Sequence, residues 1–178
     1  RAGADVLLVS GPVAIPDAPG AKTVHVETAR EMLSAVRAAL PADIFISTAA
    51  GADWRVDQAA GDKVKKAGDA PPSLRLVENH DILATIAQDD ARRPALVVGF
   101  AAETTNLLAH AQQKLARKKC DLIVANDVSA AGGVMGGAHN TGHIVEPGKV
   151  TAWPRFDKDE VAKRLVALCA ERLAEKRT

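Results

Sequence analysis

Charged side chains follow one apolar stretch of the sequence, DIFISTAA (43–50), in a pattern suited to binding an anion. Asp53 comes first, and its carboxylate could hold a divalent cation or a ribose hydroxyl, or simply form a turn. Lys63, Lys65 and Lys66 follow in the segment KVKK. One ion pair at about 4 Å and an effective dielectric of about 20 is worth roughly 4 kcal/mol before desolvation. Two or three of these lysines could therefore hold a triphosphate, although an ordinary solvated edge is the alternative.

A second set of candidate residues occurs later in the chain. In QKLARKK, Lys114 and Lys118 are four residues apart, so they share one face of a predicted helix with His110. Cations near a helix C-terminus also interact favourably with the helix dipole, which is the alternative explanation. Phe100 follows one apolar run and is either a core residue or a surface on which a base stacks. Asn126 follows another and either binds a ligand or starts a turn.

These residues depend on apolar segments that alternate between strand-like and helix-like patterns. Strands are predicted at 5–11, 23–27, 43–50, 73–78, 95–103 and 121–127, and helices at 28–40, 81–88, 103–119 and 157–176. We therefore predict an α/β fold, a Rossmann-like three-layer sandwich with a mostly parallel sheet, helices on both faces and a C-terminal β-hairpin at Pro147-Gly148. Ligands bind such sheets outside the carboxyl ends of the strands. The charged loops lie at that edge.

Local signals predict where some helices begin. Thr28 with Glu31 three residues later fits a capping box. Asn79 is placed to cap the short helix that follows it. Asp157 and Glu160 suit the N-terminus of the last helix, where acidic side chains complement the helix dipole.

Composition limits the classes of partner. The net charge of +1 gives no global field for nucleic acid or an anionic membrane, and 3% aromatic residues with no tyrosine argue against base-stacking platforms. No apolar run approaches about 18 residues and no signal peptide is visible, so we expect a cytoplasmic protein. Cys120 and Cys169 lie far apart among apolar neighbours and are predicted to be buried thiols.

The familiar catalytic and cofactor fingerprints are missing from this sequence. The glycine-rich run at 132–137 is neither GxGxxG nor a P-loop. His139 and His143 lack partners at metal-ligand spacing, and no Ser-His-Asp arrangement is evident. A nicotinamide- or flavin-binding oxidoreductase on a similar fold stays an alternative, as does a non-catalytic dimerisation module.

Several motifs occur in a specific order: LLVSGPV, AAGADWR, KVKK, NHDIL, VGFAAET, QKLARKKCDLIVANDVS and HNTGHIV. Together they resemble the phosphopantothenate–cysteine ligase half of the bacterial bifunctional coenzyme A biosynthesis protein, over essentially the whole chain. The resemblance implies a Rossmann-like homodimer that uses CTP with Mg²⁺ (or Mn²⁺). In the implied reaction 4′-phosphopantothenate attacks the α-phosphate of CTP to give an acyl-cytidylate and pyrophosphate. Cysteine then displaces CMP to form the amide.

The resemblance also implies roles for individual residues. Lys63 is the expected catalytic lysine, and Asp53 is expected near the ribose or the metal ion. CTP binding is implied for Ser47, Thr48, Ala49, Asp53, Lys63, His80, Asp81, Ile82, Leu83, Phe100, Lys114 and Lys118. Phosphopantothenate binding is implied for Ala50 and Asn126.

Three departures from the family pattern affect these expectations. The family's N-terminal strand and its glycine-rich loop, which carries an Arg and an Asn, are absent from residues 1–178, which otherwise form a single CTP-binding ligase domain. We expect such a fragment to bind CTP but to be impaired in catalysis. The bacterial proteins also carry an upstream flavin-dependent decarboxylase domain, which is an expected fusion partner. His80 stands where the family has Pro, and Ala138 stands where an acidic residue is common.

Overall fold

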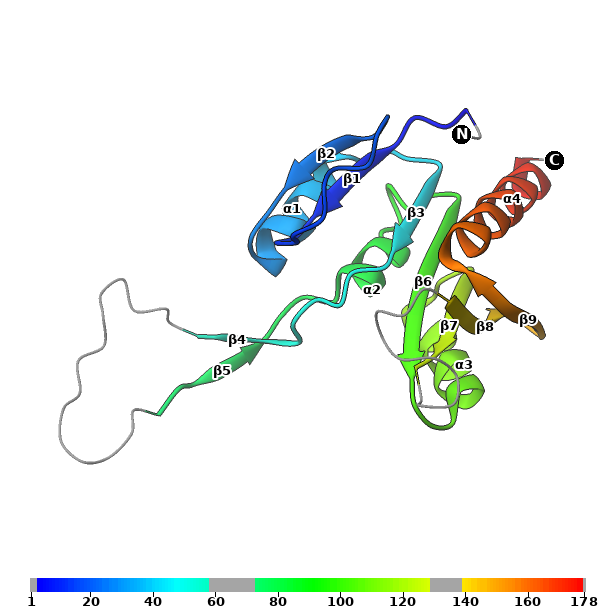
Figure 1. The fold of residues 1–178 in the computed structure, drawn as a ribbon. Coiled ribbons are helices and arrows are strands. Elements are labelled where there is room, and N and C mark those ends of the chain that lie inside the picture. Colours follow the sequence, from blue (N-terminus) through cyan, green and yellow to red (C-terminus); the bar gives the residue numbers. More distant parts are fainter. Residues whose placement is uncertain (1–2, 58–72, 129–138, 178) are drawn as a thin grey trace.

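The computed structural model describes residues 3–57, 73–128 and 139–177. The elements in this part of the chain are β1 (Leu7–Ser10), β2 (Lys22–His25), α1 (Ala29–Ala38), β3 (Ile44–Ser47), β4 (Trp54–Val56), β5 (Leu76–Glu78), α2 (Ile82–Ala87), β6 (Leu96–Glu103), α3 (Leu107–Lys118), β7 (Leu122–Asp127), β8 (His139–Glu146), β9 (Lys149–Asp157) and α4 (Lys158–Arg177). Helices are interleaved with strands, which confirms the α/β class (Figure 1).

Five strands form the main sheet, in the order β3-β6-β7-β8-β9. β3, β6 and β7 are parallel and are connected through α2 and α3, whereas β8 and β9 run antiparallel to their neighbours. The predicted C-terminal hairpin is confirmed, with its turn at Pro147 and Gly148 and a φ of +72° at the glycine. Because the hairpin adds two antiparallel strands, the sheet is mixed and not mostly parallel as expected.

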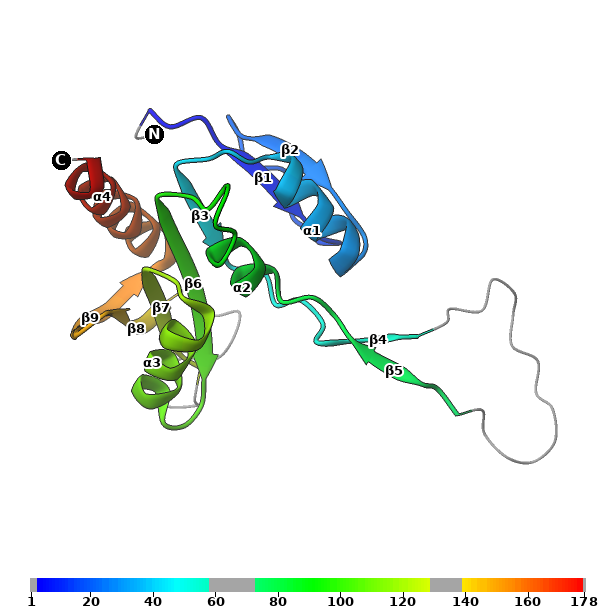
Figure 2. The same ribbon diagram turned by 180° about the vertical axis from the view of Figure 1, so that it is seen from behind.

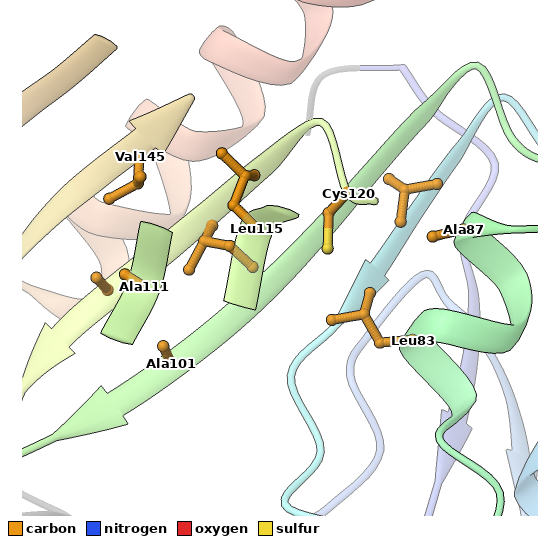
Figure 3. Packing of buried hydrophobic residues seen from close by; sticks show 10 residues of the cluster. Leu83, Ala87, Ala101, Ala111, Leu115, Cys120 and Val145 are labelled. Carbon is orange, nitrogen blue, oxygen red and sulfur yellow. The ribbon is translucent and has the colours of Figure 1, made fainter. Parts of the chain in front are cut away.

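Helices cover both faces of the main sheet (Figures 1 and 2). On one face Val97 of β6 packs with Leu83 of α2 and Leu115 of α3, as Figure 3 shows for the two leucines. On the other face Val98 packs with Leu165 of α4. Strands that are buried on both sides need apolar residues throughout, which explains why β6 and β7 contain unbroken apolar runs.

β1 and β2 form a separate parallel pair. Among the described residues β1 pairs only with β2, and β3 pairs only with β6, so the expected single sheet is divided at this point. Leu33 and Val36 of α1 pack against Ile86 of α2 and hold the pair near the main sheet. Between β1 and β3 lies a hollow of about 2250 Å³, bordered also by α1, α2, α3 and α4.

β4 and β5 form a two-stranded antiparallel arm that projects away from the rest of the molecule (Figures 1 and 2). Trp54 is 59% exposed and Leu76 is 54% exposed. A two-stranded ribbon alone is marginally stable in water, so the arm depends on its attachment to the body.

The predicted helix boundaries are partly confirmed. The capping box of Thr28 and Glu31 is present, and Asp157 caps α4 by accepting a bond from the Glu160 N–H at 2.7 Å. Asn79 is not the cap of α2, because Asp81 takes that position. The helix predicted from Glu103 begins instead at Leu107, since β6 continues to Glu103. No helix in the described ranges is long and apolar enough to cross a membrane.

Candidate functional site

The carboxyl end of β3 lies beside the middle of β6, because the two strands are parallel, Ser47 stands opposite Gly99, and β6 continues to Glu103. This register brings the loop after β3 next to Phe100. The hollow beside β3 is lined by predicted site residues from four segments of the chain: Ser47, Thr48, Ala49, Ala50, Asp53, His80, Asp81, Ile82, Leu83, Phe100, Lys114 and Lys118. The structure thus brings these residues together, while their individual roles stay predictions.

Two lysines of α3 face this hollow and are engaged with protein acceptors. Lys114 Nζ donates to the carbonyl oxygen of Phe100 in β6 at 2.7 Å. Lys118 forms an ion pair with Asp81, and its side chain is only 15% exposed. The spacing of four residues therefore places both cations on the cavity side of α3, as the sequence predicted for one helix face.

Asp81 connects two helices at the site. One carboxylate oxygen accepts a bond from the Ala84 N–H at 2.9 Å and so caps α2, while the other oxygen pairs with Lys118 at the end of α3. An N-cap satisfies a backbone N–H that no helix carbonyl can reach. The same carboxylate therefore fixes the start of α2 and the position of a cationic side chain.

Glu103 and His110 also line the hollow; sequence reasoning placed His110 on the face of the two lysines and gave Glu103 no role. His110 Nδ1 lies 3.2 Å from Glu103 Oε2, so a strand-end carboxylate meets an imidazole one helical turn into α3. Its position at the end of a buried strand was the sequence signal that could have identified Glu103 as a residue of the site. The pair adds a titratable group beside the lysines.

Asp53 is exposed at the rim of the hollow, and its backbone carbonyl accepts a bond from the Asn79 N–H at 2.8 Å. The described residues contain no group of three His, Cys, Asp or Glu side chains that could hold a metal ion alone. Mg²⁺ commonly binds one or two carboxylates together with substrate phosphates and waters. A single exposed carboxylate on a hollow that two lysines also line fits that mode of binding.

Two predicted residues are not placed in the hollow. Asn126 lies in β7 opposite Gly142 of β8 and is not among the residues that line the hollow. A Cβ atom at Gly142 would lie 2.7 Å from the Ala125 carbonyl oxygen and 3.1 Å from Asn126 Oδ1, so a glycine allows this close approach. Lys63 lies outside the described residues, as does Ala138.

Neither of the two cysteines is suited to act as a nucleophile at this site. Both are free and buried, as predicted. Burial raises the pKa of the Cys120 thiol to about 11 and also raises the pKa of Cys169. A thiol with a raised pKa is a poor nucleophile at neutral pH. Cys169 borders the hollow, but its raised pKa makes it a poor nucleophile there. The charged groups of the hollow can bind and orient an anion.

Several known proteins are similar to this chain in sequence. Residues 1–173 match the family described as DNA/pantothenate metabolism flavoprotein C-terminal domain. The chain is 49% identical over 132 residues to coenzyme A biosynthesis bifunctional protein CoaBC of Escherichia coli (strain K12), which covers 72% of this chain and 32% of that protein. It is 39% identical over 178 residues to CoaBC of Vibrio vulnificus (strain YJ016), which covers 99% of this chain and 42% of that protein. The chain thus spans well under half the length of these relatives.

Solved structures agree with the sequence comparison. The crystal structure of the C-terminal domain of CoaBC matches with a TM-score of 0.77 and 32% identity, over 97% of this chain and 76% of that chain. A DNA/pantothenate metabolism flavoprotein from Streptococcus pneumoniae matches with a TM-score of 0.75 at 17% identity, which supports the fold alone. The resemblance expected from the motifs is confirmed, and the chain belongs to the DNA/pantothenate metabolism flavoprotein C-terminal domain family.

Proposed function

We propose that this domain catalyses the CTP-dependent ligation of 4′-phosphopantothenate with cysteine. A carboxylate oxygen of phosphopantothenate attacks the α-phosphorus of CTP, and pyrophosphate leaves. The amine of cysteine then attacks the activated acyl carbon, loses a proton and displaces CMP. The observation that supports this proposal is that Asp53, Phe100, Lys114 and Lys118 line one hollow.

The described residues supply positioning and charge. Lys114 and Lys118 are placed to attract the phosphates, because each can exchange a protein acceptor for a phosphate oxygen. Phe100 of β6 offers a partly exposed ring for the cytosine base, and the His80–Leu83 segment borders the same hollow. Holding the two reactants in one place lowers the barrier without a covalent nucleophile.

A divalent cation, Mg²⁺ or Mn²⁺, would be held by Asp53 together with the phosphate oxygens of CTP. When bound it would neutralise charge on the phosphates and on the departing pyrophosphate. Ala50 borders the same rim, next to the expected position of phosphopantothenate. Asn126, at the end of β7, is proposed to contact phosphopantothenate from outside the hollow.

Lys63 is proposed as the catalytic lysine, on the family resemblance alone. Lys63→Gln in the full protein should lose pyrophosphate release, because the developing negative charge on the phosphates would lack this cation. Unchanged turnover would remove Lys63 from the mechanism.

The family's N-terminal strand is proposed to lie between β1 and β3, in the full-length protein that also carries the decarboxylase domain. Two features support this position: β1 and β3 each have a partner on one side only among the described strands, and both border the hollow. Adding the family's N-terminal segment to residues 1–178 should raise the midpoint of thermal unfolding. An unchanged midpoint would count against that position.

A homodimer in the cytoplasm completes the proposal. The exposed apolar residues of the arm, Leu74 and Leu76, support a second copy as the partner, since large exposed apolar groups often mark interfaces. Sedimentation over a range of protein concentrations would show whether the protein forms dimers.

The two free, buried cysteines suit a reducing compartment.

The function is tested by pyrophosphate release in the full protein with CTP, phosphopantothenate and cysteine, and with ATP or GTP in place of CTP. Lys118→Gln should raise the KM for CTP roughly tenfold, the effect of losing one charged contact. Lys119→Asn is the matched control, because Asn tolerates the φ of +58° at this exposed position, which does not line the hollow. No release with CTP, or equal release with ATP, would refute the proposal.

A further inference from the structure

The loop after β3 and the segment before α2 both line the hollow, yet the arm separates them in sequence by more than twenty residues. Asp53 lies on the first segment and His80 on the second. Their relative position must therefore be set by contacts at the root of the arm. Backbone segments without regular structure keep one geometry only when such contacts hold them.

Asn79 provides these contacts through its backbone N–H and both polar atoms of its side-chain amide. Its backbone N–H donates to the Asp53 carbonyl oxygen at 2.8 Å, and its side-chain amide donates to the Ala52 carbonyl oxygen at 2.8 Å. Its Oδ1 atom lies 3.4 Å from Arg55 Nη1, which also donates to the Glu78 carbonyl oxygen at 2.5 Å. We call Asn79 and Arg55, with these bonds, the root clasp.

We propose that the root clasp is a positioning element of the active site, with Asn79 and Arg55 holding Asp53 at a fixed place relative to the His80–Leu83 segment. Arg55 is the central residue of β4 and Asn79 follows β5, and both side chains are half-buried. Their bonds run between the two segments that meet at the root of the arm, and not within one of them. This inference rests on the proposed function, because it concerns how the nucleotide site is held together.

The chemistry of the amide explains why Asn fits this position. An amide side chain donates and accepts at the same time, so Asn79 can donate to a carbonyl and accept from a guanidinium. Aspartate would keep the acceptor for Arg55 but would set a carboxylate against the Ala52 carbonyl oxygen. Alanine would remove both bonds, leaving only the backbone bond to Asp53.

The experiment measures steady-state kinetics of the full protein with CTP as the varied substrate. Asn79→Ala and Asn79→Asp should each raise the KM for CTP about tenfold, the effect of losing one or two net hydrogen bonds, with the KM for cysteine unchanged. Arg55→Met should raise the KM for CTP similarly. Arg55→Lys should keep most of the affinity for CTP, because a cationic donor is retained. The Asn79→Ala and Arg55→Met effects should be less than additive, since the two residues share one bond.

Arg75→Met is the matched control. It removes an arginine from the same arm, but Arg75 is 84% exposed and pairs with Asp57 away from the root, so the KM for CTP should not change. If Asn79→Ala does not fold, as judged by thermal unfolding, the Arg55→Lys and Arg55→Met pair decides the question.

Two failures have different signatures. An unchanged KM for CTP in the Asn79 and Arg55 variants of an active protein overturns the root clasp and leaves the proposed function intact. A loss of thermal stability with normal KM values has the same meaning, because it shows a purely structural role. Absence of CTP-dependent turnover in the unmodified protein overturns the proposed function, and the inference with it.

Discussion

The main sheet and the arm are held together by different forces. β6 and β7 are buried on both faces, and the side chains of Val97, Val98 and Ile123 are fully buried. The arm consists of two three-residue strands and exposes Leu76 to solvent, and hydrogen bonds at Asn79 hold its two segments together at the root. Apolar burial thus supports the platform of the site, while a few polar contacts place its outer loops.

This difference predicts where substitutions act. Substitutions in the main sheet should lower the free energy of unfolding, because each apolar side chain that is shortened there buries less surface. In the arm and its root they should change ligand binding or association with little effect on stability. A substitution in the arm that strongly lowered the free energy of unfolding would contradict this difference between the two regions.

The largest loss of stability is expected for Ile123→Ala. Ile123 is fully buried in β7 and packs in the cluster shared with α2 and α3. Removing three buried carbon atoms leaves a cavity and should lower the free energy of unfolding by about 3 to 4 kcal/mol. Urea unfolding followed by circular dichroism measures this, with Ile123→Val as the milder control. A loss below about 1 kcal/mol would show that the core collapses around the change.

The next effect is expected at the ion pair that fastens α4 to the β8–β9 hairpin. Arg172 donates to both carboxylate oxygens of Glu146, at 2.6 and 3.3 Å, and Glu146 is only 13% exposed. The bond from Arg172 lowers the pKa of Glu146. Glu146→Gln should cost about 2 kcal/mol at pH 7, as for a charged hydrogen bond.

The pH dependence of this pair has a definite sign. A carboxyl group whose folded pKa is depressed contributes stability that is present above its unfolded value, about 4.3, and is lost as the pH falls through the folded value. The difference between wild type and Glu146→Gln should therefore shrink below about pH 4.3. Glu171→Gln, which removes an exposed partner of the same arginine, is the control. A difference that is constant between pH 7 and 3 would contradict the ion-pair explanation.

The sequence predicted most of the strands and helices of the main sheet, but not how the strands divide into separate sheets. Continuous apolar runs predicted β6 and β7, and the capping box placed the start of α1, because these signals are local. Pairing between strands is not local. Nothing in the residues of β1 or β3 shows that they would form two separate sheets among the described residues. The antiparallel addition of β8 likewise changed the expected sheet from mostly parallel to mixed.

A smaller effect is expected at Gly99, where α2 approaches β6 closely. A Cβ atom there would lie 2.7 Å from the ends of the Ile123 and Leu83 side chains. At this separation both side chains must shift, and the contacting atoms are their far ends and not backbone atoms. Gly99→Ala should therefore cost about 1 kcal/mol, the lower end for overpacking. Unfolding in urea, with Gly51→Ala as a control in open space, tests this value, and a stabilised protein would contradict it.

The candidate site shows the same division between local and tertiary signals. Strand-end positions predicted that Asp53, Phe100 and the loop after β3 would meet, and the spacing of Lys114 and Lys118 predicted one shared face. Sequence alone assigned Asn79 to a helix cap, because any Asn before a helix fits that pattern. Its bonds across the root of the arm depend on the pairing of β4 with β5, which no local pattern specified.

The smallest effect on the unfolding of one chain is expected for Leu76→Thr, on the exposed face of the arm. Leu76 contributes little buried surface within one chain, so the free energy of unfolding at low protein concentration should change by less than about 0.5 kcal/mol. If the arm contacts a second copy, the same substitution should weaken dimerisation about tenfold, since a buried leucine side chain is worth at least about 1.5 kcal/mol. Sedimentation measures this, with Val150→Thr on the exposed edge of β9 as the control. An unchanged dimer would exclude this face of the arm as the interface, and a large loss of stability in dilute protein would mean that the arm packs within its own chain.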